Sequence, residues 1–391
     1  MPKRHGVGRS ARSAVARIEE LVLASSGVDA FELVLAVSAA RLFARARGDE
    51  PPCTRRELRA TLARVRRAWP WLEPGADLDV PDPVLAQTGE LLDRALADAA
   101  GEGLDAIFEA LVTRVGKGEK GQFFTPRHVV DLAVGALALK AGERVVDPAC
   151  GSGAVRAHAR AHADVDTWGA DVDARAVRVA KLLAIAGGAS PDARVRADTL
   201  GDPRAWPKRI DVVATNPPFA GDVARDGFEL ARLVRRAERD AFFLERAIAM
   251  LRPGGRIAIV LPHGKVGAPA WAPLRRWLVD RARVFAVVSL PRETFLPHTA
   301  QRTVLLFAKK RAPGARAEPR EKILFAASER AGKDAAGEPI ARAGMRAEGG
   351  WRALDHDFSP IARRLARFFA DEGFACWRAR SSARSARSAT S

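Results

Sequence analysis

Cysteine is scarce in this chain: 391 residues include three, at positions 53, 150 and 376. They form no CxxC pair, so the sequence lacks both a disulfide framework and the paired thiolates of a structural zinc site. We therefore expect no bound metal. Scarce, unpaired cysteines are typical of a reducing compartment, and we expect a cytoplasmic protein.

Long apolar runs are also missing. No apolar stretch approaches the roughly 20 residues that cross a bilayer. The first residues are basic and polar and lead into no apolar segment, so we expect no secretory signal. From both observations we expect no contact with a membrane.

Negative charge is in deficit. Lysine and arginine number 64 against 47 acidic residues, which gives a formal charge of +17. Such a balance favours a polyanionic partner, with nucleic acid first. Biased codon usage in an Ala- and Arg-rich chain is the alternative explanation.

The first part of the chain has the apolar spacing of helices. Apolar residues recur at helical intervals from residue 14 to about 110, and the prolines near 51 and between 70 and 83 separate the helices. Another amphipathic helix is expected over 105–115. We predict a helical N-terminal domain, residues 1–115, in which residues 1–12 form a basic, disordered arm.

From residue 116 a glycine-rich loop precedes alternating strands and helices. Strands are expected at 144–147, 167–171, 193–198, 211–215, 256–261, 284–290 and 302–308. Helices are expected at 127–138, from 154, at 174–187 and at 239–251, the last stopped by the Pro-Gly-Gly at 253–255. This alternation predicts an α/β catalytic domain, residues 116–312, with a parallel sheet covered on both faces. Residues 313–391 are predicted to be an extension with one helix (360–369) and a disordered basic tail.

Asn216-Pro217-Pro218-Phe219 follows a buried strand and is the most informative motif. Each proline fixes its own φ and donates no backbone hydrogen bond, and the residue before a proline avoids the helical region. The result is a rigid loop that presents an amide, a free carbonyl and an aromatic ring. These groups suit a planar amine, and adenine, a glutamine amide and the exocyclic amine of cytosine all remain open.

A glycine turn and two acids indicate the co-substrate. Residues 147–153, Asp-Pro-Ala-Cys-Gly-Ser-Gly, follow the first strand and match neither the dinucleotide nor the Walker pattern. Asp171 ends the second strand, where an acid binds ribose hydroxyls, and Asp198 ends the third, where it can accept from an adenine amino group. Adenosine contacts without a phosphate loop fit S-adenosyl-L-methionine.

These motifs, in this order, resemble the modification (M) subunits of type I restriction systems, the γ class of N6-adenine DNA methyltransferases. The resemblance rests on residues 121–127 (Gly-Gln-Phe-Phe-Thr-Pro-Arg), 147–153, 216–219, 289–291 (Ser-Leu-Pro) and 295–299 (Phe-Leu-Pro-His-Thr). It covers roughly residues 100–310. Ala154-Val155 departs from it, because the family usually has Gly-Phe there.

The resemblance implies a Rossmann-like methyltransferase sheet and a role for each motif. The cofactor-binding residues would be Gln122, Phe123, Phe124, Thr125, Pro126, Asp147, Gly151, Ser152, Gly153, Asp171 and Asp198. The catalytic residues would be Asn216, Pro217, Pro218 and Phe219.

In the expected chemistry, the Asn216 side-chain oxygen and the Pro217 carbonyl accept the two amino hydrogens of an adenine. Methyl transfer is then an in-line displacement that depends on positioning and electrostatics. The base has to leave the duplex, and Phe219 would stack on it. Methylation of cytosine C5 would need a cysteine nucleophile, but Cys150 is more simply a small buried residue of the turn.

The predicted function is therefore an adenine-N6 methyltransferase acting on double-stranded DNA. In the family that this sequence resembles, a separate specificity (S) subunit supplies sequence recognition, and a restriction (R) subunit can join the complex. The alternatives are an RNA or protein-glutamine N-methyltransferase, and a catalytically degenerate DNA-binding scaffold.

Overall fold

The computed structural model describes residues 7–25, 27–72, 78–96, 102–115, 125–192, 194–201, 206–219, 221, 226–345 and 351–374. The predicted site residues Gln122, Phe123 and Phe124 lie outside these ranges, as does the predicted tail at 381–391.

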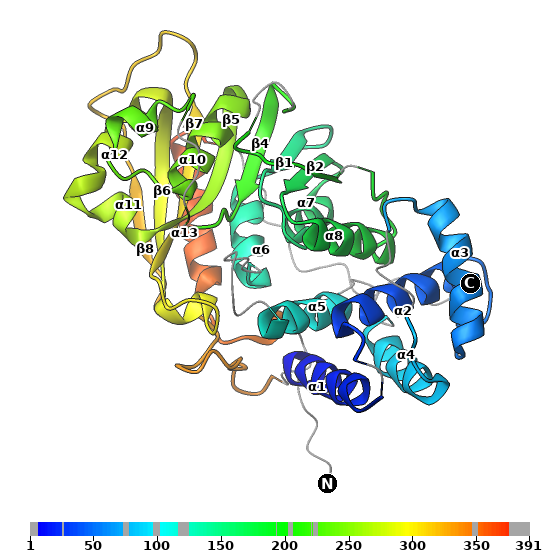
Figure 1. Cartoon of the computed structure of the whole chain (residues 1–391). Coiled ribbons are helices and arrows are strands. Elements are labelled where there is room, and N and C mark those ends of the chain that lie inside the picture. Colours follow the sequence, from blue (N-terminus) through cyan, green and yellow to red (C-terminus); the bar gives the residue numbers. More distant parts are fainter. Residues whose placement is uncertain are drawn as a thin grey trace, which may run out of the picture.

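Five helices form the N-terminal part, drawn in blue to cyan in Figure 1. They are α1 (Val7–Ser25), α2 (Ala30–Arg45), α3 (Arg55–Ala68), α4 (Asp82–Leu96) and α5 (Glu102–Val115). Their apolar faces share one core with residues of a later helix, Val179 and Leu182. The Thr54 side chain accepts a hydrogen bond from the Glu57 backbone N–H, and the Glu57 side chain accepts one from the Thr54 backbone N–H. This capping box fixes the start of α3 after the proline pair. The disordered arm expected over 1–12 is wrong from residue 7 onward, because alanine and arginine are good helix formers and α1 starts at Val7.

One eight-stranded sheet follows, in the order β3-β2-β1-β4-β5-β7-β6-β8. Its strands are β1 (Arg144–Asp147), β2 (Asp166–Asp171), β3 (Arg194–Arg196), β4 (Ile210–Thr215), β5 (Leu251–Pro262), β6 (Ala282–Leu290), β7 (Thr303–Lys310) and β8 (Leu324–Ala327). α6 (Arg127–Ala136) precedes β1. Between and after the strands lie α7 (Ala154–His162), α8 (Ala174–Ala186), α9 (Leu230–Leu233), α10 (Arg239–Met250), α11 (His263–Gly267), α12 (Ala272–Arg281) and α13 (Phe358–Asp371).

Alternate residues of the central strands enter two different cores. In β5, Ile257, Ile259 and Leu261 pack with α10 and α12. Ala258 and Val260 pack with α6, α7 and α13 on the other face. A strand buried on both faces is expected at the centre of an α/β sheet, and the predicted fold class is confirmed.

The expectation of an all-parallel sheet is wrong at β7. This strand lies antiparallel between β5 and β6. Parallel strands need a crossover connection, usually a helix. Only a short 3-10 helix (Arg292–Phe295) precedes β7, so the chain returns in the opposite direction.

The region after residue 312 adds to the same sheet. β8 pairs parallel with β6 at the sheet edge. Phe358, Ile361, Leu365 and Phe369 of α13 are buried in the core shared with α6 and α7. The domain boundaries at residues 115 and 312 stay a prediction. The region after residue 312 packs on the predicted catalytic domain.

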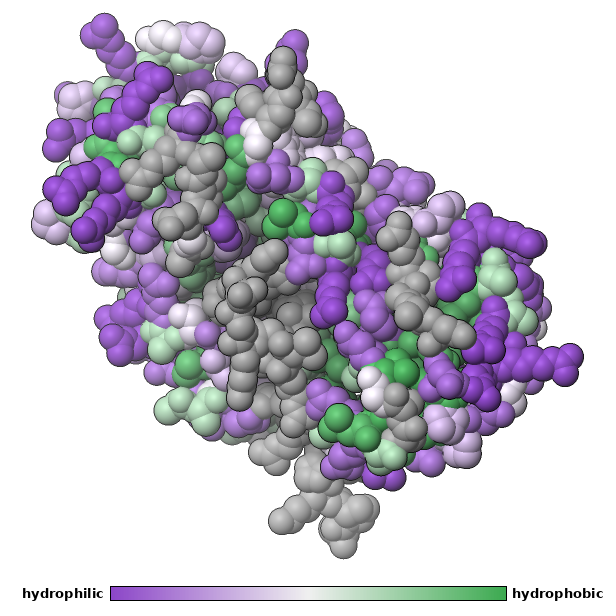
Figure 2. All heavy atoms as spheres, in the orientation of Figure 1, coloured by the Kyte–Doolittle hydropathy of each residue, from purple (hydrophilic) through white to green (hydrophobic). Residues whose placement is uncertain are grey.

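The described surface is largely hydrophilic on the face seen in Figure 2, where hydrophobic residues show only in small groups. The most exposed large apolar side chains are Leu23 and Phe325, which lie on α1 and β8. Among the described helices, none has the length and apolar composition of a membrane span.

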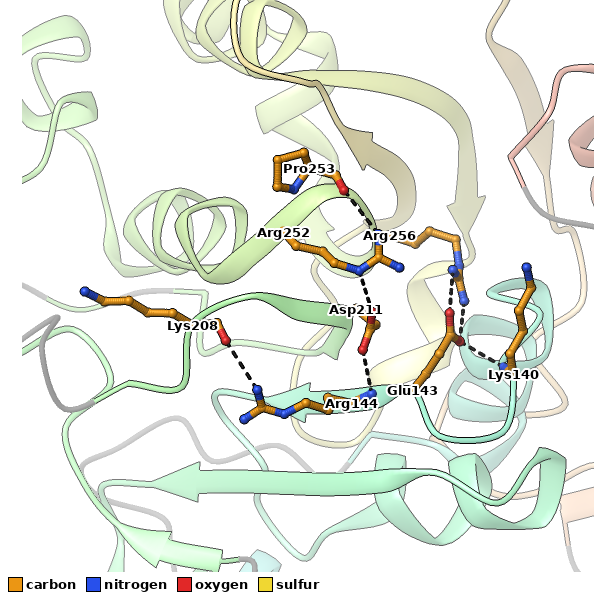
Figure 3. Close-up of polar contacts among 8 residues, drawn as sticks. All are labelled: Lys140, Glu143, Arg144, Lys208, Asp211, Arg252, Pro253 and Arg256. Carbon is orange, nitrogen blue, oxygen red and sulfur yellow. Dashed lines mark hydrogen bonds and ion pairs between the residues drawn. The ribbon is translucent and has the colours of Figure 1, made fainter.

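Ion pairs at the amino ends of β1, β4 and β5 join three neighbouring strands (Figure 3). Arg256 of β5 donates to both carboxylate oxygens of Glu143, at 3.0 and 2.7 Å, and to the Leu137 carbonyl at 2.9 Å. Asp211 of β4 accepts from the Arg144 backbone at 2.9 Å and from Arg252 at 2.5 Å. These contacts tie the strand starts to the end of α6.

Glu143→Gln tests this network. The Arg256–Glu143 side chains are only 6% and 10% exposed, and breaking a buried pair costs about 3–5 kcal/mol. Asp49→Asn breaks the exposed Arg64–Asp49 pair and should cost at most about 1 kcal/mol. Urea unfolding measures both, and equal losses would contradict the assignment.

Candidate active site

The predicted site residues gather at the carboxyl ends of three adjacent strands. β1 lies between β2 and β4 and pairs parallel with both. Asp147 ends β1, Asp171 ends β2, and Asn216 directly follows β4. Ligands of open α/β sheets bind at this edge, so the fold brings the glycine turn, Asp171 and the Asn216 loop together.

The glycine turn needs its glycines for backbone conformation. Gly151 and Gly153 have φ of +47° and +85°, in the left-handed region that other residues disfavour. A Cβ added at Gly151 would meet no atom within 4 Å, so space is open beside this residue. Gly153 caps α7, and Ser152 between the two glycines is buried.

Asp171 links the turn to the second strand. One carboxylate oxygen accepts from the Gly151 N–H at 3.0 Å and the other from the Asp173 N–H at 3.0 Å. Each oxygen keeps a further lone pair for a ligand hydroxyl. Burial raises the pKa of Asp171 above the ordinary carboxyl value.

Asp147 and Asp171 are two acids close enough to affect each other. Burial, with a smaller contribution from the charge of Asp171, raises the pKa of Asp147 to about 7. The Ala149 N–H, 3.1 Å from the Asp147 carboxylate, opposes this effect only in part. A cation placed beside these acids would favour their charged forms.

Asp198 differs from the other two acids. It follows β3 by two residues instead of ending it, and its side chain is exposed. Its carboxylate accepts from the Leu200 N–H at 2.9 Å, which stabilises the turn. Its predicted contact with an adenine amino group stays a prediction.

The Asn216 amide contacts the loop that begins α6. Its Nδ2 donates to the Thr125 hydroxyl at 3.0 Å. Its Oδ1 is buried and has no hydrogen-bond partner among the described residues. Buried polar atoms are nearly always paired, so an orphaned acceptor at a strand end points to a ligand that donates a hydrogen bond.

Phe219 is packed inside the protein. It is 5% exposed and meets Phe295 edge to face, with ring centroids 6.0 Å apart. Pro217 is buried and Pro218 is partly exposed. The stacking role of Phe219 stays a prediction.

Two other sequence features have a packing explanation. Ala154 and Val155, which replace the usual Gly-Phe, are buried in the core of α6 and α7. Cys150 is buried, and its sulfur would lie 3.2 Å from a Cβ added at Gly169. Burial raises the pKa of the Cys150 thiol, which disfavours the thiolate and agrees with a structural role.

Sequence reasoning missed the acids on α5. Asp105 forms a buried ion pair with Arg127, the first residue of α6, at 2.5 Å. Glu109 lies 3.8 Å from His298, which belongs to the motif at 295–299. Both acids sit on an amphipathic helix where a charged residue usually faces solvent, so only the three-dimensional packing reveals them.

Comparison with known proteins identifies the family. The model of the N-6 DNA methylase family matches residues 98–341. The chain belongs to this family. The resemblance drawn from the motifs is thereby confirmed.

The chain is similar to particular sequences and to solved structures. The type I restriction enzyme EcoEI methylase subunit of Escherichia coli is 32% identical over 216 residues, 50% of this chain and 44% of that protein. The ribosomal RNA small subunit methyltransferase C of Chromohalobacter salexigens is 31% identical over 163 residues, 42% of each chain. The type I restriction-modification methyltransferase subunit of Streptococcus thermophilus has the same fold, with a TM-score of 0.60 at 16% identity, covering 94% of this chain and 99% of that one. Each of the two sequence matches covers less than half of the relative.

Asp147→Asn tests the electrostatics of the turn. A carboxyl whose pKa rises from 3.8 to about 7 on folding stabilises the folded state fully below pH 4, and this stabilisation is lost as pH rises to 7. The wild-type protein should therefore lose stability over this range, and the variant should lose less. Asp164→Asn, at an exposed aspartate, should follow the wild type. The unfolding temperatures of the three proteins, measured between pH 4 and 8, test this prediction. If the unfolding temperatures of Asp147→Asn and of the wild type depend equally on pH, the raised pKa of Asp147 is refuted.

Proposed function

We propose that this protein transfers a methyl group from S-adenosyl-L-methionine to the N6 amino group of an adenine flipped out of double-stranded DNA. The observation that carries the proposal is the Oδ1 atom of Asn216. This acceptor is buried and has no hydrogen-bond partner among the described residues. An adenine amino group supplies the hydrogen-bond donor that this acceptor lacks.

The residues of the turn fit the cofactor. The space at Gly151 admits a close ligand, and the acids Asp171 and Asp147 suit hydroxyls and positive charge. Asp171 would hold the ribose and Gly151 to Gly153 would surround the methionine part, with Thr125 and Pro126 alongside. The bound cofactor supplies an electrophilic methyl group on a sulfonium.

The protein prepares the acceptor amine. An amine conjugated to a purine is a weak nucleophile, because its lone pair is delocalised into the ring. Asn216 Oδ1 and the Pro217 carbonyl would each accept one amino hydrogen, which favours a tetrahedral nitrogen with its lone pair free. Such catalysis consists of positioning and preorganised dipoles and needs no covalent intermediate.

The proposed partners are DNA, a specificity subunit and a restriction subunit. The formal charge of +17 favours a polyanion. The related E. coli protein is named a type I restriction enzyme methylase subunit. We infer that the address on DNA comes from a separate specificity subunit.

A structured RNA is the second candidate substrate. The match to a ribosomal RNA methyltransferase over 163 residues favours it, because the exocyclic amines of RNA bases offer the same planar donor. Protein glutamine presents the same chemistry. Transfer of tritium from labelled cofactor to DNA, RNA and protein separates these substrates.

Asn216→Ala should abolish transfer and leave cofactor binding unchanged. Losing one hydrogen-bonding group that acts on the transition state costs about 100- to 1,000-fold in rate. The matched control is Gln87→Ala, which removes an exposed amide on α4 and should leave the rate unchanged. Tritium transfer gives the rate, and calorimetry gives the cofactor affinity.

Two outcomes would contradict the proposal. Wild-type rates in Asn216→Ala would exclude the role of the amide. If calorimetry found no cofactor binding to the wild-type protein, the scaffold alternative would replace the enzyme.

A further inference from the structure

The two ends of the Asn216 amide have opposite hydrogen-bonding properties. Only the oxygen can accept the hydrogens of an amine, and a rotation of 180° about the last side-chain bond would present the NH₂ group instead. The NH₂ group donates to the Thr125 hydroxyl at 3.0 Å, and the oxygen has no partner among the described residues. In this contact the Thr125 hydroxyl is the acceptor, and it holds the Asn216 amide where its oxygen is left without a partner among the described residues.

The position of Thr125 is fixed by the two residues after it in the chain. Pro126 is the residue before α6, and Arg127 is its first helical residue. Arg127 donates from Nε to an Asp105 oxygen at 3.0 Å, and its terminal nitrogen lies 2.5 Å from the same oxygen. The start of α6 is thus fixed to α5 of the helical N-terminal part.

Burial makes this attachment stiff. The Arg127 and Asp105 side chains are 17% and 7% exposed. A charge pair removed from water is weakly screened, and separating it would leave a buried charge without a partner. Only Pro126 lies between Arg127 of this ion pair and Thr125, whose hydroxyl binds Asn216.

We propose that Thr125, held by the Asp105–Arg127 ion pair, is a positioning residue that keeps the catalytic amide in place. The inference rests on the proposed function, in which Asn216 receives the acceptor amine. The helical N-terminal part thereby contributes to the chemistry through Asp105, and none of the three positioning residues touches the reacting nitrogen.

Thr125→Val keeps the side-chain shape and removes the hydroxyl. We expect kcat for methyl transfer to fall about 100-fold, the loss typical of a misplaced reacting group, while the KM for DNA changes little. Thr125→Ser restores the hydroxyl and should recover most of kcat. The matched control is Thr88→Val, because Thr88 is a buried threonine of α4 whose hydroxyl has no partner among the described residues; it should leave kcat unchanged.

Asp105→Asn tests the ion pair against a second pair that also joins the two parts of the chain. Arg178 of α8 and Glu32 of α2 lie 2.6 Å apart, with side chains 14% and 15% exposed. Both Asp105→Asn and Glu32→Gln should lower the unfolding temperature, but only Asp105→Asn should lower kcat. Equal effects on kcat would show that Asp105 acts through general stability, which overturns its positioning role.

A double-mutant cycle tests the hydrogen bond without any activity measurement. The unfolding temperatures of Thr125→Val, Asn216→Ala and the double variant should be non-additive, because each single change removes the same bond. Additive shifts overturn the inference. An unchanged kcat in Thr125→Val overturns it too, and leaves the proposed function standing. Non-additive shifts in a protein that methylates no substrate would confirm the Thr125–Asn216 hydrogen bond but refute methyl transfer, and with it the catalytic role of this contact.

Discussion

Parallel pairing of β1 with β2 on one side and β4 on the other is the constraint on which the site depends. Val145 and Val146 of β1 are paired on both sides and buried on both faces. A strand in this position has no surface for polar side chains until it ends. Polar residues therefore accumulate at the carboxyl ends, and parallel direction brings these ends to one edge. The proximity of Asp147, Asp171 and Asn216 follows from strand order.

Polar groups at the amino ends of the strands differ in hydrogen bonding from those at the carboxyl ends. At the amino edge, the Glu143 carboxylate receives three hydrogen bonds, from the Arg256 guanidinium and the Lys140 backbone. At the carboxyl edge, Asp147 is buried with a raised pKa and Asn216 Oδ1 has no partner among the described residues. Satisfied polar groups stabilise a fold, whereas unsatisfied ones cost free energy and mark places where a ligand completes the bonding. The polar groups at the amino ends therefore stabilise the fold, and those at the carboxyl ends are the candidates for binding a ligand.

Sequence alone predicts the parts of the fold that have local signals. The alternation of strands and helices, the glycine turn and the Asn-Pro-Pro-Phe loop were all predictable, because glycine and proline restrict the backbone directly. The direction of β7 was not, since an apolar run reads the same in either direction. At 253–255 the sequence predicts only a helix stop. α10 ends earlier, at Met250, and the Pro-Gly-Gly segment lies inside β5 at a register shift, where a Cβ at Gly255 would come within 3.0 Å of the Ile210 carbonyl. Long-range contacts such as Asp105–Arg127 leave no local pattern at all.

The helical N-terminal part and the region after residue 312 both form ion pairs with the sheet and its helices. Glu32 and Asp105 hold α8 and α6 from one side, and each of these helices begins close to a site motif. From the other end of the chain, Glu372 binds Arg283 of β6 at 2.6 Å, and Phe369 packs on Phe285 and Phe307. A positioned amide works only if the groups around it do not move, so a loop between two strands is insufficient by itself. Contacts from both ends of the chain thus reach the sheet that carries Asn216, although the sequence motifs of the candidate site occupy only short segments of it.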